Sequence, residues 1–411
     1  MKIAVLTLGC KVNQSESAVI EGSLRKNGHI LVKLSEHPDI CIINTCTVTA
    51  KSDYQSRQLI RRALRAGGNV YVTGCYAEMN RDHILQISET IQVFNNKNKY
   101  HIINAIESNS EGYTFSYSPR ARPYVKIQDG CNMACSYCIV PKARGRSQSV
   151  PSREVLERIS CFEQEGYPEV ILTGIHIGSY GYDLKPKASL AELLRMVLKK
   201  TRISRIRISS LEAYEISDEL LEIFCNNRIC RHIHLPLQSG DDSILKMMKR
   251  RYSTREYRNV VEKISDLLPG IALGTDIITG FPGEGDVEFE NTIKFIEQLP
   301  FSYVHIFPFS SRPSTQAAQM QGRVAHHRIK ERCTALDHLN RAIKMRYAES
   351  HIGKRLDMVV EEHDIAGTAT GTSSNYLKIK IPSNTCPVKS LVSVGVQGRE
   401  EDYLIGNPLQ G

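Results

Sequence analysis

The stretch "RPYVKIQDGCNMACSYCIVPKARGRSQS" (residues 122–149) contains three closely spaced cysteines directly after a short apolar segment. Cys131, Cys135 and Cys138 have the spacing C-x3-C-x2-C. A zinc site would normally show a second cysteine pair or histidines at matching spacing, and none lies nearby in the sequence. Thiolates suit iron–sulfur clusters, and three of them on a 4Fe–4S cube leave one iron without a protein ligand. The spacing therefore predicts a cluster with one open iron.

The triplet follows the first of six strand-like runs that alternate with helix-like segments between residues 122 and 346. The runs are residues 124–128, 169–174, 205–210, 232–237, 271–280 and 303–309. Six such units are too few for a closed eight-stranded barrel, so we expect an open, partial (β/α)6 barrel. In α/β barrels the loops that follow the strands carry the chemistry, which is where the triplet stands.

The segments on either side of this region have different patterns. In residues 1–105, apolar runs at 3–8, 39–45 and 69–74 are each followed by a helix-like stretch, at 13–27, 51–66 and 80–88. This pattern predicts a small, open α/β domain with a parallel sheet. Residues 106–121 read as a polar linker with a short strand. After a long charged helix expected at 319–350, residues 347–411 have strand-like runs at 355–362, 376–382 and 390–398, which predict a small β-barrel.

A second set of three cysteines is scattered in the sequence but not in the predicted fold. Cys10, Cys46 and Cys75 each come just after one of the three N-terminal strands. Parallel strands bring their carboxyl ends to one edge of a sheet, so we expect these thiols to converge there. The pattern predicts a second 4Fe–4S cluster, again with one open iron. We interpret Cys41 as an apolar filler and the other five cysteines as structural.

Bulk properties limit the class of protein. The chain has 411 residues and 12 cysteines. It has no run of the roughly 20 apolar residues that a membrane span needs, and "MKIAVLTLGCK" lacks the features of a signal peptide. We therefore expect a cytoplasmic protein whose cysteines serve metal binding or catalysis rather than disulfides.

Several polar or small residues stand just past predicted barrel strands, where they could contact a cofactor. They are Thr173, Gly174, Ser209, Glu212 and Gln238. A glycine at such a place lets the backbone approach a ligand closely. Ordinary loop capping explains each of these residues equally well.

Arginines near both triplets are candidates for contacts with nucleic acid. Arg57, Arg61 and Arg65 have helical spacing that puts them on one face beside the second triplet, and Arg144 and Arg146 follow the first. Each could instead belong to a solvated charged face.

The formal net charge of +9 suits a nucleic-acid partner without requiring one. The cationic segment "KRRY" (249–252) is better explained as a solvated face. Residues 347–411 hold more acidic than basic residues, so we doubt that this segment binds phosphates tightly by itself.

The first triplet, with Tyr137 just before its last cysteine, resembles the radical S-adenosylmethionine (SAM) superfamily. The resemblance implies that the amine and carboxylate of SAM chelate the open iron. It also implies that an electron from the cluster cleaves SAM into methionine and a 5′-deoxyadenosyl radical. The place of Thr173 and Gly174 is similar to the one that binds the SAM amine in that superfamily.

Two cysteine triplets followed by a small β-module resemble the methylthiotransferases over essentially the whole chain. This resemblance implies insertion of a methylthio group into an unactivated C–H bond. It implies that the auxiliary cluster carries the sulfur, that one SAM methylates it and that a second SAM supplies the radical. The scheme also needs an electron donor protein and a sulfur source. The last segment resembles a TRAM domain, which the family uses to hold substrate.

Residues around Cys10 and Cys46 distinguish branches of this family. "LGCKVNQSES" and "NTCTVTAKSDYQSRQLIRRA" resemble the MtaB branch. That implies the substrate N6-threonylcarbamoyladenosine at tRNA position 37, in the anticodon stem-loop. The isopentenyladenosine branch more often shows "GCQMN", and the branch that modifies an aspartate of a ribosomal protein shows "GCPKN". These two reactions are the alternatives within the family. A non-catalytic iron–sulfur protein that binds RNA or carries electrons is the alternative from another class.

Overall fold

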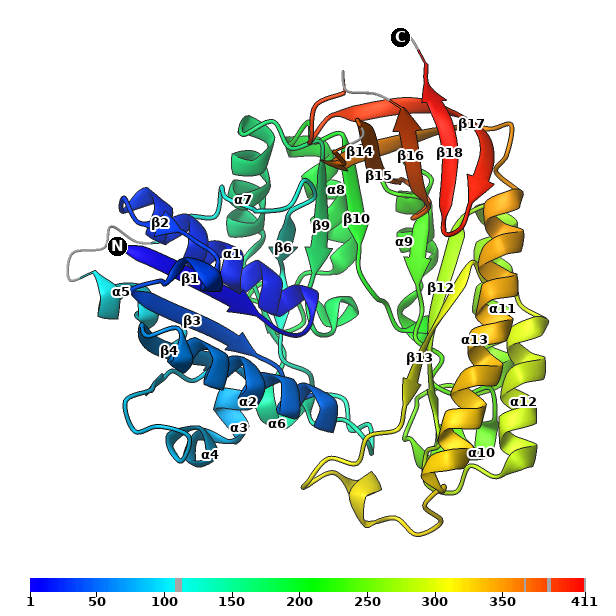
Figure 1. Cartoon of the computed structure of the whole chain (residues 1–411). Coiled ribbons are helices and arrows are strands. Elements are labelled where there is room, and N and C mark those ends of the chain that lie inside the picture. The colour runs from blue at the N-terminus through cyan, green and yellow to red at the C-terminus, as the bar shows by residue number, and fades with distance from the viewer. Residues whose placement is uncertain (108–112, 366, 383–385, 410–411) are drawn as a thin grey trace.

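The computed structural model describes residues 1–107, 113–365, 367–382 and 386–409. The chain folds into three successive parts (Figure 1). An N-terminal α/β part, coloured blue, lies beside a central half-barrel coloured green to yellow, and a small β-barrel coloured red lies at one end of the half-barrel. None of the helices within the described ranges is both long and apolar enough to cross a membrane.

The N-terminal part is an open parallel sheet, as predicted. Its strands have the order β2-β1-β3-β4-β5. Every residue of β3 is buried, because helices cover both faces of the sheet. The bounds are β1 Lys2–Thr7, α1 Lys11–Lys26, β2 Ile30–Leu31, η1 Leu34–Glu36, β3 Ile40–Thr45, α2 Ala50–Arg65, β4 Asn69–Gly74, α3 Cys75–Met79, α4 Arg81–Leu85, β5 Gln92–Val93 and α5 His101–Ile106. The helix expected at 80–88 is present as the shorter α4, which ends at Leu85. The sequence did not predict α3, which precedes it and is separated from it by Asn80, a residue with non-helical torsion angles.

The six strands of the central part are parallel and form two sheets of three, in the orders β10-β9-β6 and β11-β12-β13. The backbone N–H of Ile206 in β10 donates to the carbonyl of Arg228 at 2.7 Å, and an isolated parallel bridge joins Ile206 to Ile229. These contacts connect the two sheets into one open barrel, as predicted.

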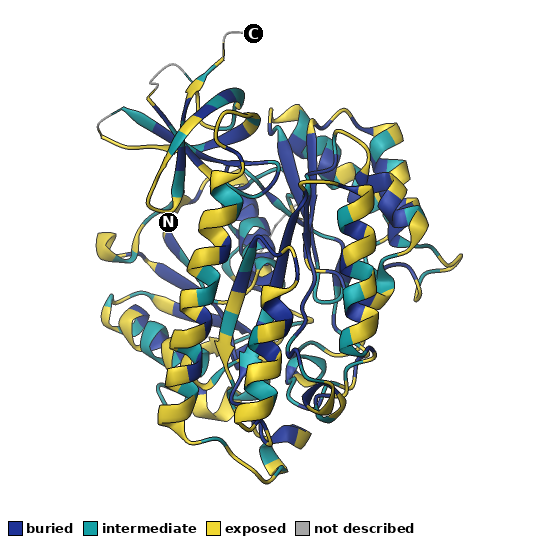
Figure 2. Cartoon of the chain, turned by 90° about the vertical axis from the view of Figure 1, so that its right-hand side faces the viewer, coloured by how far each residue is buried: buried dark blue, intermediate teal, exposed yellow. Residues whose placement is uncertain are grey.

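Helices cover the outside of this barrel, with an exposed outer face and a buried inner face (Figure 2). The expected helix at 319–350 begins only at His326, and residues Gln316–Gln319 form a separate 3-10 helix. The bounds are β6 Tyr124–Lys126, β7 Gln128–Asp129, α6 Val140–Arg144, β8 Gln148–Ser149, α7 Ser152–Gln164, β9 Glu169–Thr173, η2 Ile177–Ser179, α8 Leu190–Lys200, β10 Arg205–Ile208, η3 Ala213–Glu215, α9 Asp218–Phe224, β11 His232–His234, α10 Asp242–Met247, α11 Thr254–Leu267, β12 Ala272–Thr279, α12 Asp286–Glu297, β13 Tyr303–Pro308, η4 Gln316–Gln319 and α13 His326–Glu349.

The C-terminal part is a closed barrel with the strand order β14-β15-β16-β18-β17. The bounds are β14 Arg355–His363, β15 Thr368–Ser373, β16 Lys378–Pro382, β17 Leu391–Glu400 and β18 Tyr403–Pro408. The sequence predicted the barrel but missed β15 and β18, which have small residues where strands approach closely. A Cβ atom at Gly371 of β15, for example, would lie 2.1 Å from the carbonyl oxygen of Val359.

The linker between the first two parts lies against α1. A Cβ atom at Gly22 of α1 would lie 2.7 Å from the Cβ of Tyr117, so glycine permits this close approach. Residues 113–121 contain no strand, contrary to expectation, and residues 108–112 of the predicted linker lie outside the described residues.

Candidate active site

The first cysteine triplet lies in the loop between β7 and α6, just past the end of the first barrel strand. Its three thiols are partly exposed, and nitrogen atoms surround them. The backbone N–H of Met133 donates to Cys131 Sγ at 3.3 Å, and Arg250 Nη1 donates to Cys135 Sγ at 3.5 Å. Donors of this kind stabilise thiolate sulfurs, so the loop is suited to hold a metal cluster.

The electrostatics of this triplet also fit a cluster. Burial, together with the neighbouring sulfurs of Cys135 and Cys131, raises the pKa of Cys138 to about 12. Burial likewise raises the pKa of Cys135, against the opposing effect of Arg250. Three thiolates in a partly buried loop would repel one another, and iron would supply the positive charge that compensates them.

A second layer of ion pairs fixes the groups around the triplet. Arg250 pairs with Glu212, and His176 pairs with Glu215 at 2.6 Å while its Nδ1 lies 3.9 Å from Cys131 Sγ. The Arg250 side chain is only 2% exposed, so the prediction that "KRRY" is a solvated face is wrong for this residue. Charge spacing alone did not distinguish it from its exposed neighbours.

The residues predicted at the strand ends have different environments. Thr173 and Ser209 are buried, and the Ser209 hydroxyl donates to the Leu172 carbonyl at 2.7 Å. A Cβ atom at Gly174 would lie 2.7 Å from the side chain of Ile177, so the loop packs closely there. Gln238 has a positive φ of 71°. Contacts of these residues and of Glu212 with a cofactor stay predictions.

A cavity of about 530 Å³ lies beside the first triplet, a size typical of small-molecule sites. Its wall comes from loops that follow β9 and β10. The residues that line it are Asn132, Met133, His176, Gly178, Ser179, Tyr182, Ser189, Leu190, Ala191, Tyr214, Glu215, Ser217, Glu219, Leu220 and Arg251.

The second triplet lies at the carboxyl edge of the N-terminal sheet. Cys10 is the N-cap of α1, Cys46 directly follows β3, and Cys75 is the first residue of α3. A Cβ atom at Gly9 would lie 3.1 Å from Cys46 Sγ, so this sulfur packs directly against the loop that carries Cys10. The structure therefore brings the three strand ends together, with Cys10 exposed and the other two buried.

The thiols of the second triplet influence one another. Burial raises the pKa of Cys75 to about 11; Arg144 opposes this shift, and charges on Cys10 and Cys46 add to it. Burial also raises the pKa of Cys46. Three thiols that share one charge environment are a donor set that fits an iron–sulfur cluster.

Arg144 connects the two triplets. It ends α6, the short helix that follows Cys138, and its Nε donates to Cys75 Sγ at 3.3 Å. Its Nη1 contacts Glu16 at 3.0 Å and Asp129 at 2.9 Å, and its side chain is 1% exposed. The prediction that Arg144 contacts RNA therefore does not hold for this guanidinium, whose donors face protein carboxylates and a cysteine. The second triplet lies beside the loop of the first.

The other predicted arginines are more accessible. Arg61 and Arg65 of α2 are exposed, and so is Arg146. Arg57 is partly buried, and its Nη1 lies 3.3 Å from the hydroxyl of Tyr76, which follows Cys75. Their contact with RNA stays a prediction.

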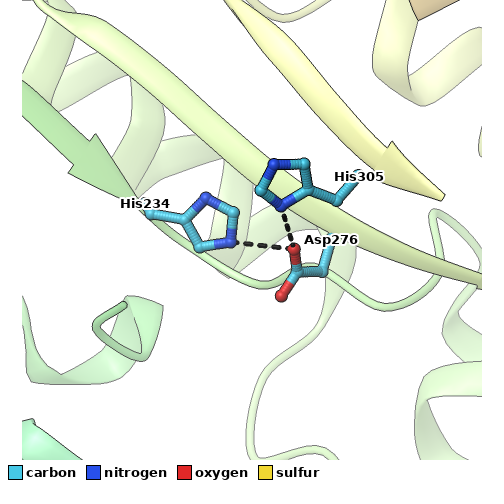
Figure 3. Close-up of side chains that lie close together, drawn as sticks. All are labelled: His234, Asp276 and His305. Atoms are coloured by element: carbon cyan, nitrogen blue, oxygen red, sulfur yellow. Dashed lines mark hydrogen bonds and ion pairs between the residues drawn. The ribbon is translucent and has the colours of Figure 1, made fainter. Parts of the chain in front are cut away.

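A polar cluster inside the barrel was not predicted from the sequence (Figure 3). His234 of β11 and His305 of β13 both contact Asp276 Oδ1 of β12, at 2.9 and 3.1 Å. The Tyr303 hydroxyl lies 3.0 Å from His234 Nδ1. The signal in the sequence is the presence of histidine or aspartate within three predicted barrel strands, which makes the barrel lumen polar here.

Comparisons with known proteins agree with this arrangement. The family model of the radical SAM superfamily matches residues 125–296, and that of "Uncharacterized protein family UPF0004" matches residues 2–95. The solved structure of the radical S-adenosylmethionine methyltransferase TsrM from Kitasatospora setae, with cobalamin and a [4Fe-4S] cluster bound, superimposes with a TM-score of 0.57 at 13% identity. The match covers 94% of this chain and 83% of that one, and it shows a shared fold.

Curated relatives extend over the full length. The "Threonylcarbamoyladenosine tRNA methylthiotransferase MtaB" of Chlamydia pneumoniae is 36% identical over 412 residues, covering 98% of this chain and 97% of the relative. The "tRNA-2-methylthio-N(6)-dimethylallyladenosine synthase" of Pelotomaculum thermopropionicum is 31% identical over 434 residues, covering 98% and 97%. The chain therefore belongs to the radical SAM methylthiotransferase family, in which it resembles the MtaB branch.

Proposed function

We propose that this chain transfers a methylthio group to N6-threonylcarbamoyladenosine at tRNA position 37. Relatives that carry this activity in their names are 33–36% identical to it. The observation that carries the proposal is the pair of cysteine triplets joined by Arg144, because methylthio transfer needs a radical source and a sulfur source within reach of one substrate atom. Relatives named for dimethylallyladenosine make that nucleoside the second candidate.

As a radical SAM enzyme, the protein uses a 4Fe–4S cluster and SAM. We assign that cluster to Cys131, Cys135 and Cys138, where it would supply the electron that cleaves SAM. Arg250 and the Met133 N–H hold the thiolates in place, and the 530 Å³ cavity next to His176 offers room for SAM. We assign a second 4Fe–4S cluster, which carries the sulfur, to Cys10, Cys46 and Cys75.

The proposed substrate reaches the site as the anticodon stem-loop of a tRNA. Arg146, which follows the first triplet in the sequence, and Arg61 and Arg65 of α2, which follows Cys46, are exposed and can contact phosphates. The C-terminal barrel, which resembles a TRAM domain, is a second surface for the tRNA. We propose that the reaction takes place in the cytoplasm, where an electron donor protein and a sulfur source also take part.

The test uses tRNA from a strain in which the gene is deleted. Reconstituted anaerobic protein, SAM and dithionite are added, and the nucleosides are separated by liquid chromatography and identified by mass spectrometry. We expect 2-methylthio-N6-threonylcarbamoyladenosine together with 5′-deoxyadenosine. Methylthio-dimethylallyladenosine alone would support the second candidate, and absence of 5′-deoxyadenosine would support a non-catalytic role. Cleavage of SAM without a modified nucleoside would direct attention to a protein substrate.

A further inference from the structure

Lys11 is a cation for which the described part of the chain shows no ion-pair partner. It is the first residue of α1, directly after Cys10, and its side chain is partly buried. Among the described residues, no carboxylate lies within ion-pair distance of its ammonium and no acceptor within hydrogen-bond distance. A partly buried ammonium without a counter-ion costs free energy, which a bound anion can offset.

The charged groups that interact electrostatically with Lys11 come from both the N-terminal part and the barrel. They are Cys10 on its own loop, Asp276 in the barrel lumen, and Arg122 and Arg207. Lys11 is therefore within electrostatic reach of both the second cysteine triplet and Asp276 of the lumen.

The arginines and Asp276 of this set already have partners. Arg207 pairs with Glu169 at 2.8 Å, and Arg122 pairs with Glu361. Asp276 accepts from two histidines, as Figure 3 shows. Lys11 has no ion-pair partner in the described part of the chain, so it is available to an anionic group of a ligand.

We infer that Lys11 binds the carboxylate of the threonylcarbamoyl group and so selects the substrate. The inference rests on the proposed function and names the residue that recognises its substrate. The threonylcarbamoyl group has one charged atom group, its carboxylate, whereas a dimethylallyl group is apolar and would leave Lys11 unpaired. The imidazole of His305, half-exposed and oriented by Asp276, makes the same lumen suited to a polar substituent.

The test measures binding of the anaerobic holoenzyme to three anticodon stem-loops that differ only at position 37. One carries adenosine, one carries N6-threonylcarbamoyladenosine and one carries N6-dimethylallyladenosine. We expect the wild type to bind the threonylcarbamoyl stem-loop at least about tenfold more tightly than the adenosine one, as a hydrogen bond to a charged group provides. Lys11→Gln should reduce this ratio to about twofold or less, and Lys11→Arg should keep most of it.

A matched control separates substrate selection from general RNA binding. Lys51 is the second residue of α2, also follows a cysteine of the second triplet, and is exposed. Lys51→Gln should change the affinity for all three stem-loops by the same factor and keep their ratios. Iron content and the circular dichroism spectrum check that each variant is folded and loaded.

A change on the ligand makes the test independent of any variant. The methyl ester of the threonylcarbamoyl group keeps its size and removes its charge, so the wild type should bind that stem-loop about as it binds the adenosine one. Unchanged affinity for the ester, or a Lys11→Gln variant that keeps the wild-type ratio, would overturn the inference and leave the proposed function standing. If the wild type modifies only the dimethylallyl stem-loop, both the inference about Lys11 and the proposed function are wrong.

Discussion

A buried carboxylate at the joint between the N-terminal sheet and the barrel offers a sharp test of how the two triplets are held together. Glu16 of α1 is fully buried and contacts three cations: Lys99, Lys126 at 2.8 Å and Arg144 at 3.0 Å. Burial opposes its ionisation, but these cations outweigh burial and hold the pKa of Glu16 well below its usual value. Glu16→Gln keeps the shape of the side chain and removes the charge.

The expected cost follows from the cations that remain. Lys99 is 2% exposed and would lose the one carboxylate that pairs with it among the described residues, while Arg144 and Lys126 would keep Asp129. Removing one partner of a buried pair costs about 3–5 kcal/mol. With an unfolding entropy of about 2 cal/mol/K per residue, this cost lowers the Tm of a chain of this size by about 3–6 °C if it unfolds as a unit.

Circular dichroism measures the Tm, and hydrogen exchange of peptides from α1 and β6 reports whether the joint opens. The control is Glu157→Gln, which breaks an ion pair with Arg153 whose side chains are 60% and 91% exposed. That change should cost no more than about 0.5 kcal/mol. A Glu16→Gln variant with the Tm and exchange rates of the control would refute this account of the joint. Because Arg144 contacts Cys75, we also expect less methylthio product for each SAM that is cleaved.

Two further predictions concern pH and salt. Burial opposes ionisation of Glu169, but Arg205, Arg207 and Arg122 outweigh burial and lower the pKa of Glu169 to about 2. The ionised carboxylate therefore stabilises the fold fully above about pH 4.5, and this stabilisation is lost as the pH falls toward 2. Glu169→Gln should therefore cost about 3 kcal/mol at pH 6 and much less at pH 3 in urea unfolding; equal costs would contradict this. Replacing Arg61 and Arg65 with Gln should weaken tRNA binding and make the affinity depend less steeply on salt concentration. An unchanged salt dependence would mean that this face of α2 is in contact with solvent and not with tRNA.

Local patterns predicted most of the fold. Runs such as residues 69–74 are continuous and apolar because both faces of their sheet are covered, and β4 has those same bounds. The order of strands and the place of each cysteine just past a strand follow from the chain direction in parallel sheets. This is why Cys10, Cys46 and Cys75 could be grouped although they are far apart in the sequence.

The parts that the sequence did not predict depend on long-range pairing. Arg144 and Arg250 look like surface cations in sequence, and only the folded chain shows which carboxylates and thiols they meet. The grouping of His234 with Asp276 likewise depends on the register between β11 and β12. Strand β15 is composed largely of small and hydroxyl residues, so it lacks the apolar signal of the other strands.

The central claim is that the two triplets have different chemical roles. It is tested by changing each triplet to alanine and measuring both 5′-deoxyadenosine and methylthio nucleoside by chromatography under dithionite. The variant that lacks Cys131, Cys135 and Cys138 should form neither product, because the electron source for SAM cleavage is gone. The variant that lacks Cys10, Cys46 and Cys75 should still form 5′-deoxyadenosine but no methylthio nucleoside. Methylthio nucleoside from this second variant would contradict the account, because sulfur would then reach the substrate without the N-terminal triplet.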